Sequence, residues 1–441
     1  MHFSARTIAG VAAFITITIL YTINAVSARD PTSFFFNPRK GYAARYSAIR
    51  RQQAEDFLQA YHDAPSHEIV KAGHERNRKL CVGIPSFKRE GVRYLRDTVG
   101  SLLEGLTPEE RQEMYIIVFI PHSNPNVHPE YNEAWLPGLA DQVLTYEFGD
   151  DQMQHIRNME RQGGLYVEKA LFDYRYLLSA CTEQFTPYIA MVEDDVVAMD
   201  GWYHRTMAAI SEAEQQAAER HARADFLYLR LFYTEEFFGW NAEDWRSYLY
   251  YSLWVASIPT AILLFVRCAR PTTKLSLTIT TPRAVAAIYA VLGASILIFF
   301  GMGRNTVLPL PTGVAEMSEF GCCAQAFVFP HLKALALIEY FKDRRLGFVD
   351  VLTEDYANER RELRYAMTPG VMQHIGKKSS KIDDYGPQSK WGRSVAEKIW
   401  SFTFERFDWI KLRQEHENSA RERREAKMEK EAQFANQQAG V

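Results

Sequence analysis

The sequence lacks an excess of charge of either sign, because 51 Lys and Arg residues stand against 54 Asp and Glu residues in a chain of 441. Proteins that bind nucleic acid usually carry a basic footprint, so the balance gives no argument for nucleic acid as a partner. Asn-x-Ser/Thr sequons are also absent, and we expect no N-glycosylation. No internal repeat is evident, which argues against a solenoid or a propeller.

Long apolar runs are present, and the first lies near the N-terminus. Residues Ile8–Val26 carry no charge and have about the length that a membrane-spanning helix needs. A cleavable signal peptide, cut near Ala25–Ala28, is the alternative, but the apolar part of such a peptide is usually shorter, at about 7 to 15 residues. We therefore predict a cytosolic tail over residues 1–7 and an uncleaved signal anchor over residues 8–27.

Two further uncharged runs, Tyr248–Val266 and Ala284–Met302, flank a short segment that is rich in Arg and Lys and has no acid. Such loops tend to remain in the cytosol. A first span that leads from the cytosol into the lumen places this loop in the cytosol as well, so both signals predict the same topology. We predict a transmembrane hairpin over residues 247–303; a pair of buried core helices is the alternative.

The chain has few cysteines, five in all. The predicted topology places four of them in an oxidising lumen, where a disulfide can form: Cys81, Cys181, Cys322 and Cys323. Their pairing does not follow from the sequence. The fifth, Cys268, falls at the cytosolic edge of the membrane.

The soluble segments show alternating strand and helix patterns. Short apolar runs that end in turns predict buried strands at 80–85, 114–121, 188–192, 225–232 and 322–330. Helical spacing predicts helices at 91–106, 167–183 and 331–343, with another beginning near Asp350. This alternation is typical of an α/β domain with a largely parallel sheet. We predict a lumenal stem over residues 28–79, a domain formed by residues 80–246 and 304–410, and a charged tail over residues 411–441.

Three consecutive acids, Glu193, Asp194 and Asp195, follow the strand predicted at 188–192. Ligands of open α/β sheets bind beyond the carboxyl ends of the strands. Carboxylate oxygens suit Mn²⁺ or Mg²⁺, which leave positions open for substrate phosphates. An acidic turn that opens the following helix is the alternative.

Other polar residues fall at comparable places. Arg89 follows the first strand and could meet a phosphate or a base, although an ordinary exposed turn explains it as well. The segment Pro121–Asn124 follows the second strand in the same way. Near the end of the domain, a neutral His374 could complete a Mn²⁺ site, whereas a structural role is the usual one for a lone histidine.

Five segments taken in order resemble a known family: "GIPSFKRE", "EKALFDYRYLLSACTEQFTPYIAMVEDDVV", "GCCAQAFVFP", "VDVLTEDYA" and "TPGVMQHIGKKSS". They look like lumenal glycosyltransferases of the GT-A fold and are similar to the N-acetylglucosaminyltransferase IV family of N-glycan branching. They are more similar to the Golgi family that adds N-acetylgalactosamine to GPI anchors after attachment. That family also has an N-terminal span and a transmembrane pair inserted in its catalytic domain, and the resemblance covers roughly residues 1 to 410.

The resemblance implies a UDP-sugar donor and a divalent metal, Mn²⁺ or Mg²⁺, at a DXD-like motif. Asp195 would be a metal ligand, with Asp194 and Glu193 as further contacts at the donor site, and His374 occupies the place of a C-terminal metal ligand. Pro85 and Arg89, which lie in "GIPSFKRE", are assigned to the donor site.

An inverting transferase also needs a carboxylate that takes the proton of the acceptor hydroxyl. The order of the motifs favours Asp350 for this role; Glu354 and Asp355 are rivals, and a helix N-cap is the structural alternative for Asp350. Lys169 and Asp173, on the helix before the acidic run, are expected to line the donor site, or else to form a charged surface pair.

Together with the predicted topology, the resemblance implies a multi-pass Golgi glycosyltransferase with a lumenal GT-A domain. We expect it to transfer a sugar, GalNAc from UDP-GalNAc, to the mannose core of GPI anchors, with GPI-anchored proteins and membrane lipids as partners. An N-glycan branching GlcNAc transferase is a second interpretation. A non-catalytic scaffold or trafficking receptor for GPI-anchored proteins is a third, although a scaffold needs neither the acidic run nor the histidine.

Overall fold

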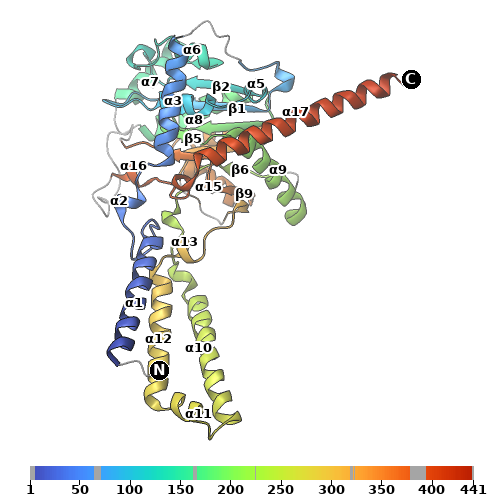
Figure 1. Cartoon of the computed structure of the whole chain (residues 1–441). Helices are drawn as coiled ribbons and strands as arrows, with labels where there is room; N and C mark the ends of the chain where they lie inside the picture. Colours follow the sequence, from blue (N-terminus) through green and yellow to red (C-terminus); the bar gives the residue numbers. More distant parts are fainter. Residues whose placement is uncertain are drawn as a thin grey trace. The chain divides into compact units, whose positions relative to one another are not determined.

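The computed structural model describes residues 5–63, 71–161, 166–223, 225–317, 321, 323–377 and 394–439. The chain divides into two compact units, one formed by Met1–Ala43 and Glu235–Leu310 and the other by Ala44–Thr234 and Pro311–Val441. We call them the helical unit and the sheet unit. Figure 1 labels their elements.

The strands, all in the sheet unit, are β1 (Leu80–Pro85), β2 (Met114–Phe119), β3 (Gln142–Leu144), β4 (Tyr188–Val192), β5 (Val196–Ala198), β6 (Tyr228–Arg230), β7 (Gly313–Glu316), β8 (Ala326–Pro330), β9 (Arg364–Thr368) and β10 (Met372–His374). The helices of the sheet unit are α3 (Tyr46–Asp63), α4 (Leu95–Leu103), α5 (Pro108–Gln112), α6 (Trp135–Leu139), α7 (Asp150–Arg161), α8 (Tyr166–Thr182), α9 (Trp202–His221), α14 (His331–Arg344), α15 (Val349–Arg360), α16 (Val395–Lys398) and α17 (Trp409–Ala439). Those of the helical unit are α1 (Ala5–Ser27), α2 (Pro38–Gly41), α10 (Trp245–Ala269), α11 (Lys274–Ile279), α12 (Pro282–Gly301) and α13 (Arg304–Val307).

An eight-stranded sheet with the order β3-β2-β1-β4-β8-β6-β9-β7 forms the centre of the sheet unit. The strands β3, β2, β1 and β4 are parallel to one another, as the alternating pattern predicts. In contrast, β8 runs antiparallel to both of its neighbours. A second, two-stranded sheet pairs β5 with β10 in antiparallel register, so that His374 lies opposite Val196.

Helices cover both faces of the large sheet, and the residues of β1 show why. Leu80, Val82 and Ile84 point into one hydrophobic cluster, which also holds Val99 of α4. Cys81 points into the cluster on the opposite face, with residues of α8 and α14. A strand buried on both faces reads as a continuous apolar run, which is how these residues appear in the sequence. Cys81 is disulfide-bonded to Cys181, and the bond links β1 to α8.

The range expected to form a stem, residues 28–79, is divided between the two units. Its later part contributes α3, which packs against α4. The Arg50 side chain is fully buried there, with Nε 2.8 Å from the carbonyl oxygen of Ala198 and Nη2 2.9 Å from that of Ser101. The helix is rich in polar residues, and the buried Arg50 contacts the rest of the sheet unit together with the buried apolar residues Tyr46 and Leu58.

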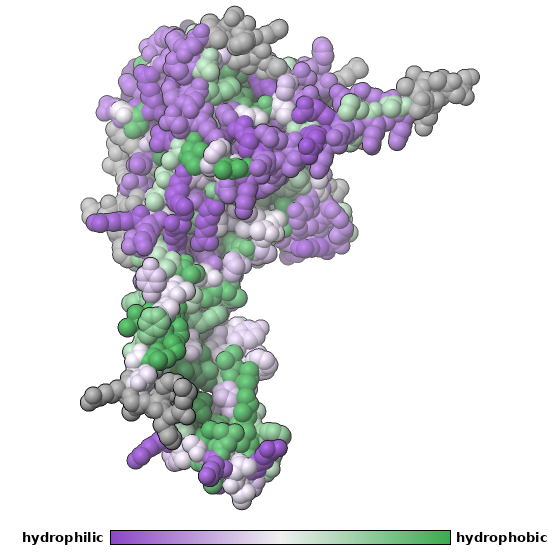
Figure 2. Space-filling model, viewed as in Figure 1, coloured by the Kyte–Doolittle hydropathy of each residue, from purple (hydrophilic) through white to green (hydrophobic). Residues whose placement is uncertain are grey.

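The helical unit contains long apolar helices. Among the described residues, three helices are long and apolar enough to span a membrane: α1, the helix that includes α10, and α12. In α10 and α12 the apolar stretch has no buried residue, and Figure 2 shows hydrophobic surface over this unit. Their exposed apolar side chains include Trp254, Phe265 and Leu297. The arrangement is that of a membrane protein.

The predicted charged tail is helical over most of its length. It forms α17, in which Leu412, His416 and Ala420 are buried within the sheet unit. Cys322 lies outside the described residues.

Candidate functional site

The acidic run begins at the carboxyl end of β4, which lies between β1 and β8 in the sheet. A buried threonine of α4 holds its backbone: the Thr98 hydroxyl lies 2.7 Å from the carbonyl oxygens of both Asp194 and Val196. The Glu193 amide donates to the Gln325 carbonyl at 2.9 Å, and the Gln325 side-chain amide donates to Glu193 Oε2 at 3.2 Å. The three carboxylates therefore occupy fixed positions at this edge of the sheet.

Glu193, Asp195 and His374 form a group that could hold a metal ion. One ligand atom from each lies within 4.8 Å of the others. His374 Nε2 is 3.4 Å from Asp195 Oδ2, and its Nδ1 is 3.0 Å from the Ile399 carbonyl oxygen. A neutral His374 that donates from Nδ1 to this carbonyl directs the lone pair of Nε2 toward Asp195.

Two further observations fit a bound cation. Asp195 Oδ1 is buried and has no hydrogen-bond partner among the described residues. A Cβ atom at Gly376 would lie 2.8 Å from His374 Nε2 and would also contact Asp195, so the glycine keeps this space open. Two carboxylates and an imidazole are ligands that suit Mn²⁺, and the oxygens suit Mg²⁺.

The repulsion within the acidic run is offset in part by Arg89. Its Nη1 donates to both carboxylate oxygens of Asp194 at 2.8 Å, and its Nη2 donates to Asp195 Oδ2 at 3.2 Å. Burial raises the pKa of Asp194 although Arg89 opposes the shift, whereas the pKa of Asp195 is lowered because His374 and Arg89 outweigh its burial. Arg89 and Asp194, both expected at the donor site, thus bind each other, while Arg89 Nε is buried without a partner among the described residues.

A chain of buried polar side chains continues behind Asp194. The Ser86 hydroxyl donates to Asp194 Oδ2 at 2.7 Å and lies 3.0 Å from His128 Nε2. On the other side of the ring, His128 Nδ1 is 3.3 Å from Glu130 Oε2. Burial lowers the pKa of His128 to about 4 and raises that of Glu130 to about 7. A neutral His128 that donates from Nε2 to Ser86 orients the serine proton toward Asp194.

Sequence reasoning missed His128 and Glu130. The loop after the second strand also contains His122 and Glu133, and no spacing in the sequence distinguishes His128 and Glu130 from surface residues. Only the parallel pairing of β1 with β2 brings that loop beside Ser86. The signal that was present, polar residues after a buried strand, identified the neighbouring segment Pro121–Asn124 instead.

Lys169 and Asp173 form a buried network. Lys169 Nζ lies 2.7 Å from Asp173 Oδ2, 2.9 Å from the Tyr146 hydroxyl and 2.7 Å from the Pro121 carbonyl oxygen, and Tyr146 donates to Asp173. Burial raises the pKa of Asp173 to about 6 in spite of Lys169. The alternative of a charged surface pair is therefore wrong, and the network lies against the loop after β2. Pro85 is the last residue of β1.

The three candidates for the base all lie on α15 and differ in how far their side chains are buried. Asp350 is in its first turn, half-buried, and accepts from the amides of Cys323 at 3.3 Å and Val351 at 3.0 Å. Glu354 is buried and is engaged by Arg230 at 2.7 Å and Arg364 at 2.8 Å. Asp355 is exposed. Of the three, Asp350 has a carboxylate that is oriented yet not occupied by an ion pair with a described cation.

The loop before β8 contacts both parts of the candidate site. Its Cys323 amide donates to Asp350, and its Gln325 side chain donates to Glu193. Asp350 and the group of Glu193, Asp195 and His374 are thus connected through residues that are two apart in the chain. The structure brings together Arg89, Asp194, Asp195 and His374 by direct contact, and Asp350 through this loop.

Comparison with known proteins gives one family and several relatives. The family model described as "GPI-N-acetylgalactosamine transferase PGAP4" matches residues 80–373. An "Alpha-1,3-mannosyl-glycoprotein 4-beta-N-acetylglucosaminyltransferase A" from Bos taurus is 26% identical over 147 residues, 31% of this chain and 27% of the relative. An "Alpha-1,6-mannosyl-glycoprotein 4-beta-N-acetylglucosaminyltransferase" from Gallus gallus is 24% identical over 173 residues, 37% of each chain. The matched region thus spans between about a quarter and two fifths of these relatives' length.

Proposed function

The chain belongs to the GPI-N-acetylgalactosamine transferase PGAP4 family, and from this we propose that it is a Golgi membrane glycosyltransferase of the GT-A fold. In this proposal it transfers a sugar, GalNAc from UDP-GalNAc, to the mannose core of GPI anchors as a side chain. The observation that carries the proposal is the group of Glu193, Asp195 and His374 at the carboxyl end of β4. The position is the one at which open α/β sheets bind their ligands.

Glu193, Asp195 and His374 would hold a divalent cation, Mn²⁺ or Mg²⁺. When bound, the cation supplies positive charge that stabilises the diphosphate as it leaves. Arg89 fixes Asp194 through two hydrogen bonds of 2.8 Å and presents an Nε that has no partner among the described residues. In our proposal Arg89 both compensates the acidic run and contacts the donor.

Asp350 is proposed as the base of an inverting transfer. The acceptor hydroxyl oxygen forms a bond to the anomeric carbon, the bond from that carbon to the phosphate oxygen breaks, and the hydroxyl proton passes to the Asp350 carboxylate. The amides of Cys323 and Val351 hold the carboxylate in place. Both donate to its ionised form, which is the form that a base requires.

Membrane attachment suits a lipid-linked acceptor. The membrane helices α10 and α12 are inserted in the chain between β6 and β7. A transferase held at a membrane meets a GPI glycan at a higher effective concentration than a soluble one would. We propose that the sheet unit is lumenal and that the loop between α10 and α12, with its Arg and Lys residues, is cytosolic.

Mass spectrometry of GPI glycans tests the proposal in cells that lack this protein and are rescued with wild type, Asp195→Ala or Asp151→Ala. Asp151 is exposed at the start of α7 and serves as the matched control. We expect a HexNAc side branch that is lost without the protein and restored by wild type and by Asp151→Ala only. Loss of a hexose branch would mean that the protein is a glycosyltransferase that uses another donor sugar. Rescue by Asp195→Ala would contradict the assignment of the metal site.

A second candidate is transfer of GlcNAc to N-glycans, and it is favoured by the names of the relatives. The same cells decide it: unchanged GPI glycans together with simplified N-glycan branching would replace the first proposal with this one. Normal glycans of both classes would instead favour a non-catalytic scaffold.

A further inference from the structure

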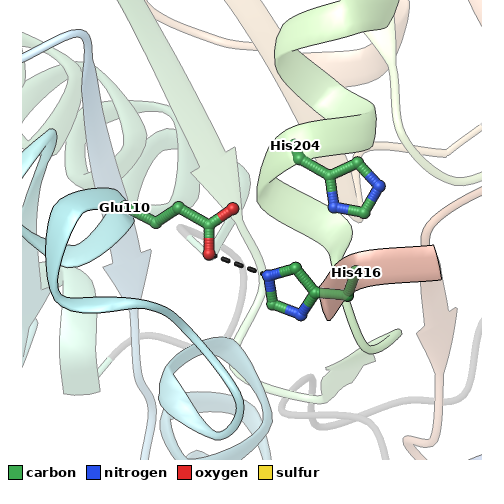
Figure 3. A group of neighbouring side chains, drawn as sticks. All are labelled: Glu110, His204 and His416. Carbon is green, nitrogen blue, oxygen red and sulfur yellow. Dashed lines mark hydrogen bonds and ion pairs between the residues drawn. The ribbon is translucent and has the colours of Figure 1, made fainter. Parts of the chain in front are cut away.

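A second group of potential metal ligands lies away from the acidic run. Glu110 of α5, His204 of α9 and His416 of α17 offer one ligand atom each, and these atoms lie within 4.8 Å of one another. Figure 3 shows the three side chains converging from three separate helices, with one ring nitrogen of each histidine directed toward the middle of the group. Glu110 and His416 are buried, and the His204 side chain is 11% exposed.

The nitrogen that His204 directs into the group has no hydrogen-bond partner in the part of the chain that the structure describes. His204 Nδ1 is buried without a hydrogen bond to any described residue. A buried polar atom of this kind costs free energy unless something binds it. On the other side of the group, His416 Nε2 is 2.8 Å from Glu110 Oε2.

The outward-facing nitrogen of each histidine meets a carboxylate. His416 Nδ1 is 2.9 Å from Asp200 Oδ1, and His204 Nε2 is 3.4 Å from Glu415 Oε1. Metal-bound histidines commonly donate their second ring N–H to a carboxylate, which fixes the tautomer and leaves the first nitrogen free to bind the metal. Both histidines here are arranged in this way.

The backbone leaves room for the two rings to approach each other. Gly201 precedes α9 with φ of 72°, and a Cβ atom there would lie 2.9 Å from His204 Nδ1 and 3.2 Å from His416 Cβ. Glycine adopts this left-handed conformation without strain and adds no atom beside the group. A polar cavity of about 520 Å³, lined by His204, Glu415 and Glu422 among others, adjoins it and can supply water.

We propose that Glu110, His204 and His416 bind a structural Zn²⁺ ion, with water from the cavity as fourth ligand. Two imidazole nitrogens and a carboxylate oxygen suit zinc, and bonds of about 2.0–2.2 Å place tetrahedral ligand atoms roughly 3.4 Å apart. The separation of 2.8 Å between His416 Nε2 and Glu110 Oε2 is shorter than that value, and all three ligand atoms lie within 4.8 Å of one another, so rotation of the side chains would complete the site. The ion ties α17 to α5 and α9.

Metal content of the purified full-length chain tests this site apart from the catalytic one. Asp195→Asn serves as the background because it disrupts the group at the acidic run. After equilibration with Zn²⁺ and desalting, we expect one zinc per chain in this background. Adding His204→Gln should remove it, whereas His221→Gln, an exposed position on the same helix, should retain it. Equal zinc in all three proteins, or none in the background, would overturn the site.

Two further measurements keep the test valid if a variant folds poorly. In otherwise wild-type protein, His204→Gln should lower the zinc content by one equivalent, and chelation should lower the Tm of wild type but not that of His204→Gln. X-ray absorption at the zinc edge of the Asp195→Asn protein should show scattering from two imidazoles. A spectrum without imidazole scattering would mean that Glu110 and His416 form only an ion pair here.

Discussion

At the scale of single residues, the two adjacent carboxylates Asp194 and Asp195 differ in their contacts. Asp194 binds Arg89 and Ser86, and Asp195 faces His374 with one oxygen that has no partner in the described part of the chain. Arg89 is shared by these two adjacent carboxylates, whereas Ser86 binds only Asp194 and His374 faces only Asp195. In our proposal Asp194 is held by the protein's own side chains, and Asp195 binds the metal ion.

Asp350 is the first residue to test. Asp350→Asn removes the proposed base, so we expect kcat for sugar transfer to fall by roughly 10² to 10⁴-fold. Asp355→Asn, on the same helix but exposed, should keep near-normal activity. Release of UDP by the purified variants measures the effect, with mass spectrometry of the product. Equal activity of Asp350→Asn and wild type would assign the base elsewhere.

The raised pKa of Glu130 predicts that the stability of the folded protein depends on pH. Its pKa is raised to about 7 by burial, from an ordinary value near 4.5. Between these two values the folded protein binds the proton that the unfolded chain releases, so stability falls as pH rises from about 4.5 to 7. The loss amounts to about 3 kcal/mol at most.

Glu130→Gln has no carboxyl to ionise and should lose this component. Thermal unfolding of wild type and variant at pH 5 and pH 7.5 measures it, and the Tm of the variant should change less between the two. The same change in both proteins would show that Glu130 titrates normally.

At the scale of elements, we expect the packing of α3 against the rest of the sheet unit to depend strongly on one arginine. The fully buried Arg50 pairs with Glu104 and donates to the carbonyls of Ala198 and Ser101. Arg50→Met leaves these groups without their donor, and we expect the free energy of unfolding to fall by about 3–5 kcal/mol.

Arg51 is the matched control for Arg50. It lies on the same helix and pairs with Asp97 of α4, but its side chain is 48% exposed. Arg51→Met should therefore change stability by less than about 1 kcal/mol. Thermal unfolding in detergent compares the two variants, and equal effects would mean that α3 is held mainly by its apolar contacts.

The elements also differ in how well the sequence predicts them. The run at 80–85 is a strand with those bounds, and the helix expected at 331–343 is α14, one residue longer. The strand expected at 225–232 contains β6, whereas β3, β5 and β10, with three residues each, are not among the predicted strands. Three residues are too few for a periodic pattern, and whether such a segment pairs depends on what lies beside it.

At the scale of the whole molecule, the proposed orientation can be tested with one cysteine. Among the described cysteines, Cys268 is free and exposed, whereas Cys81, Cys181 and Cys323 are disulfide-bonded. A membrane-impermeant maleimide should label Cys268 in cells with a permeabilised plasma membrane and intact Golgi vesicles. Cys268→Ser should abolish this labelling. Labelling that requires detergent would place the loop between α10 and α12 in the lumen.

The sequence by itself determined what depends on residues close together in the chain. The apolar runs that form β1, β2, β4 and the membrane helices are local, because burial on both faces of a strand or in a bilayer requires continuous hydrophobic stretches. The acidic run after β4 is local too, and so is its position at a strand end.

The tertiary structure alone decided which distant residues meet. His374 reaches Asp195 only because β10 pairs with β5, and Arg89 is drawn to Asp194 because both follow neighbouring strands. Glu110, His204 and His416 come from three helices whose sequences show no shared pattern. Such contacts depend on the packing of the whole unit, which brings together residues hundreds of positions apart, and no short-range pattern in the sequence records it.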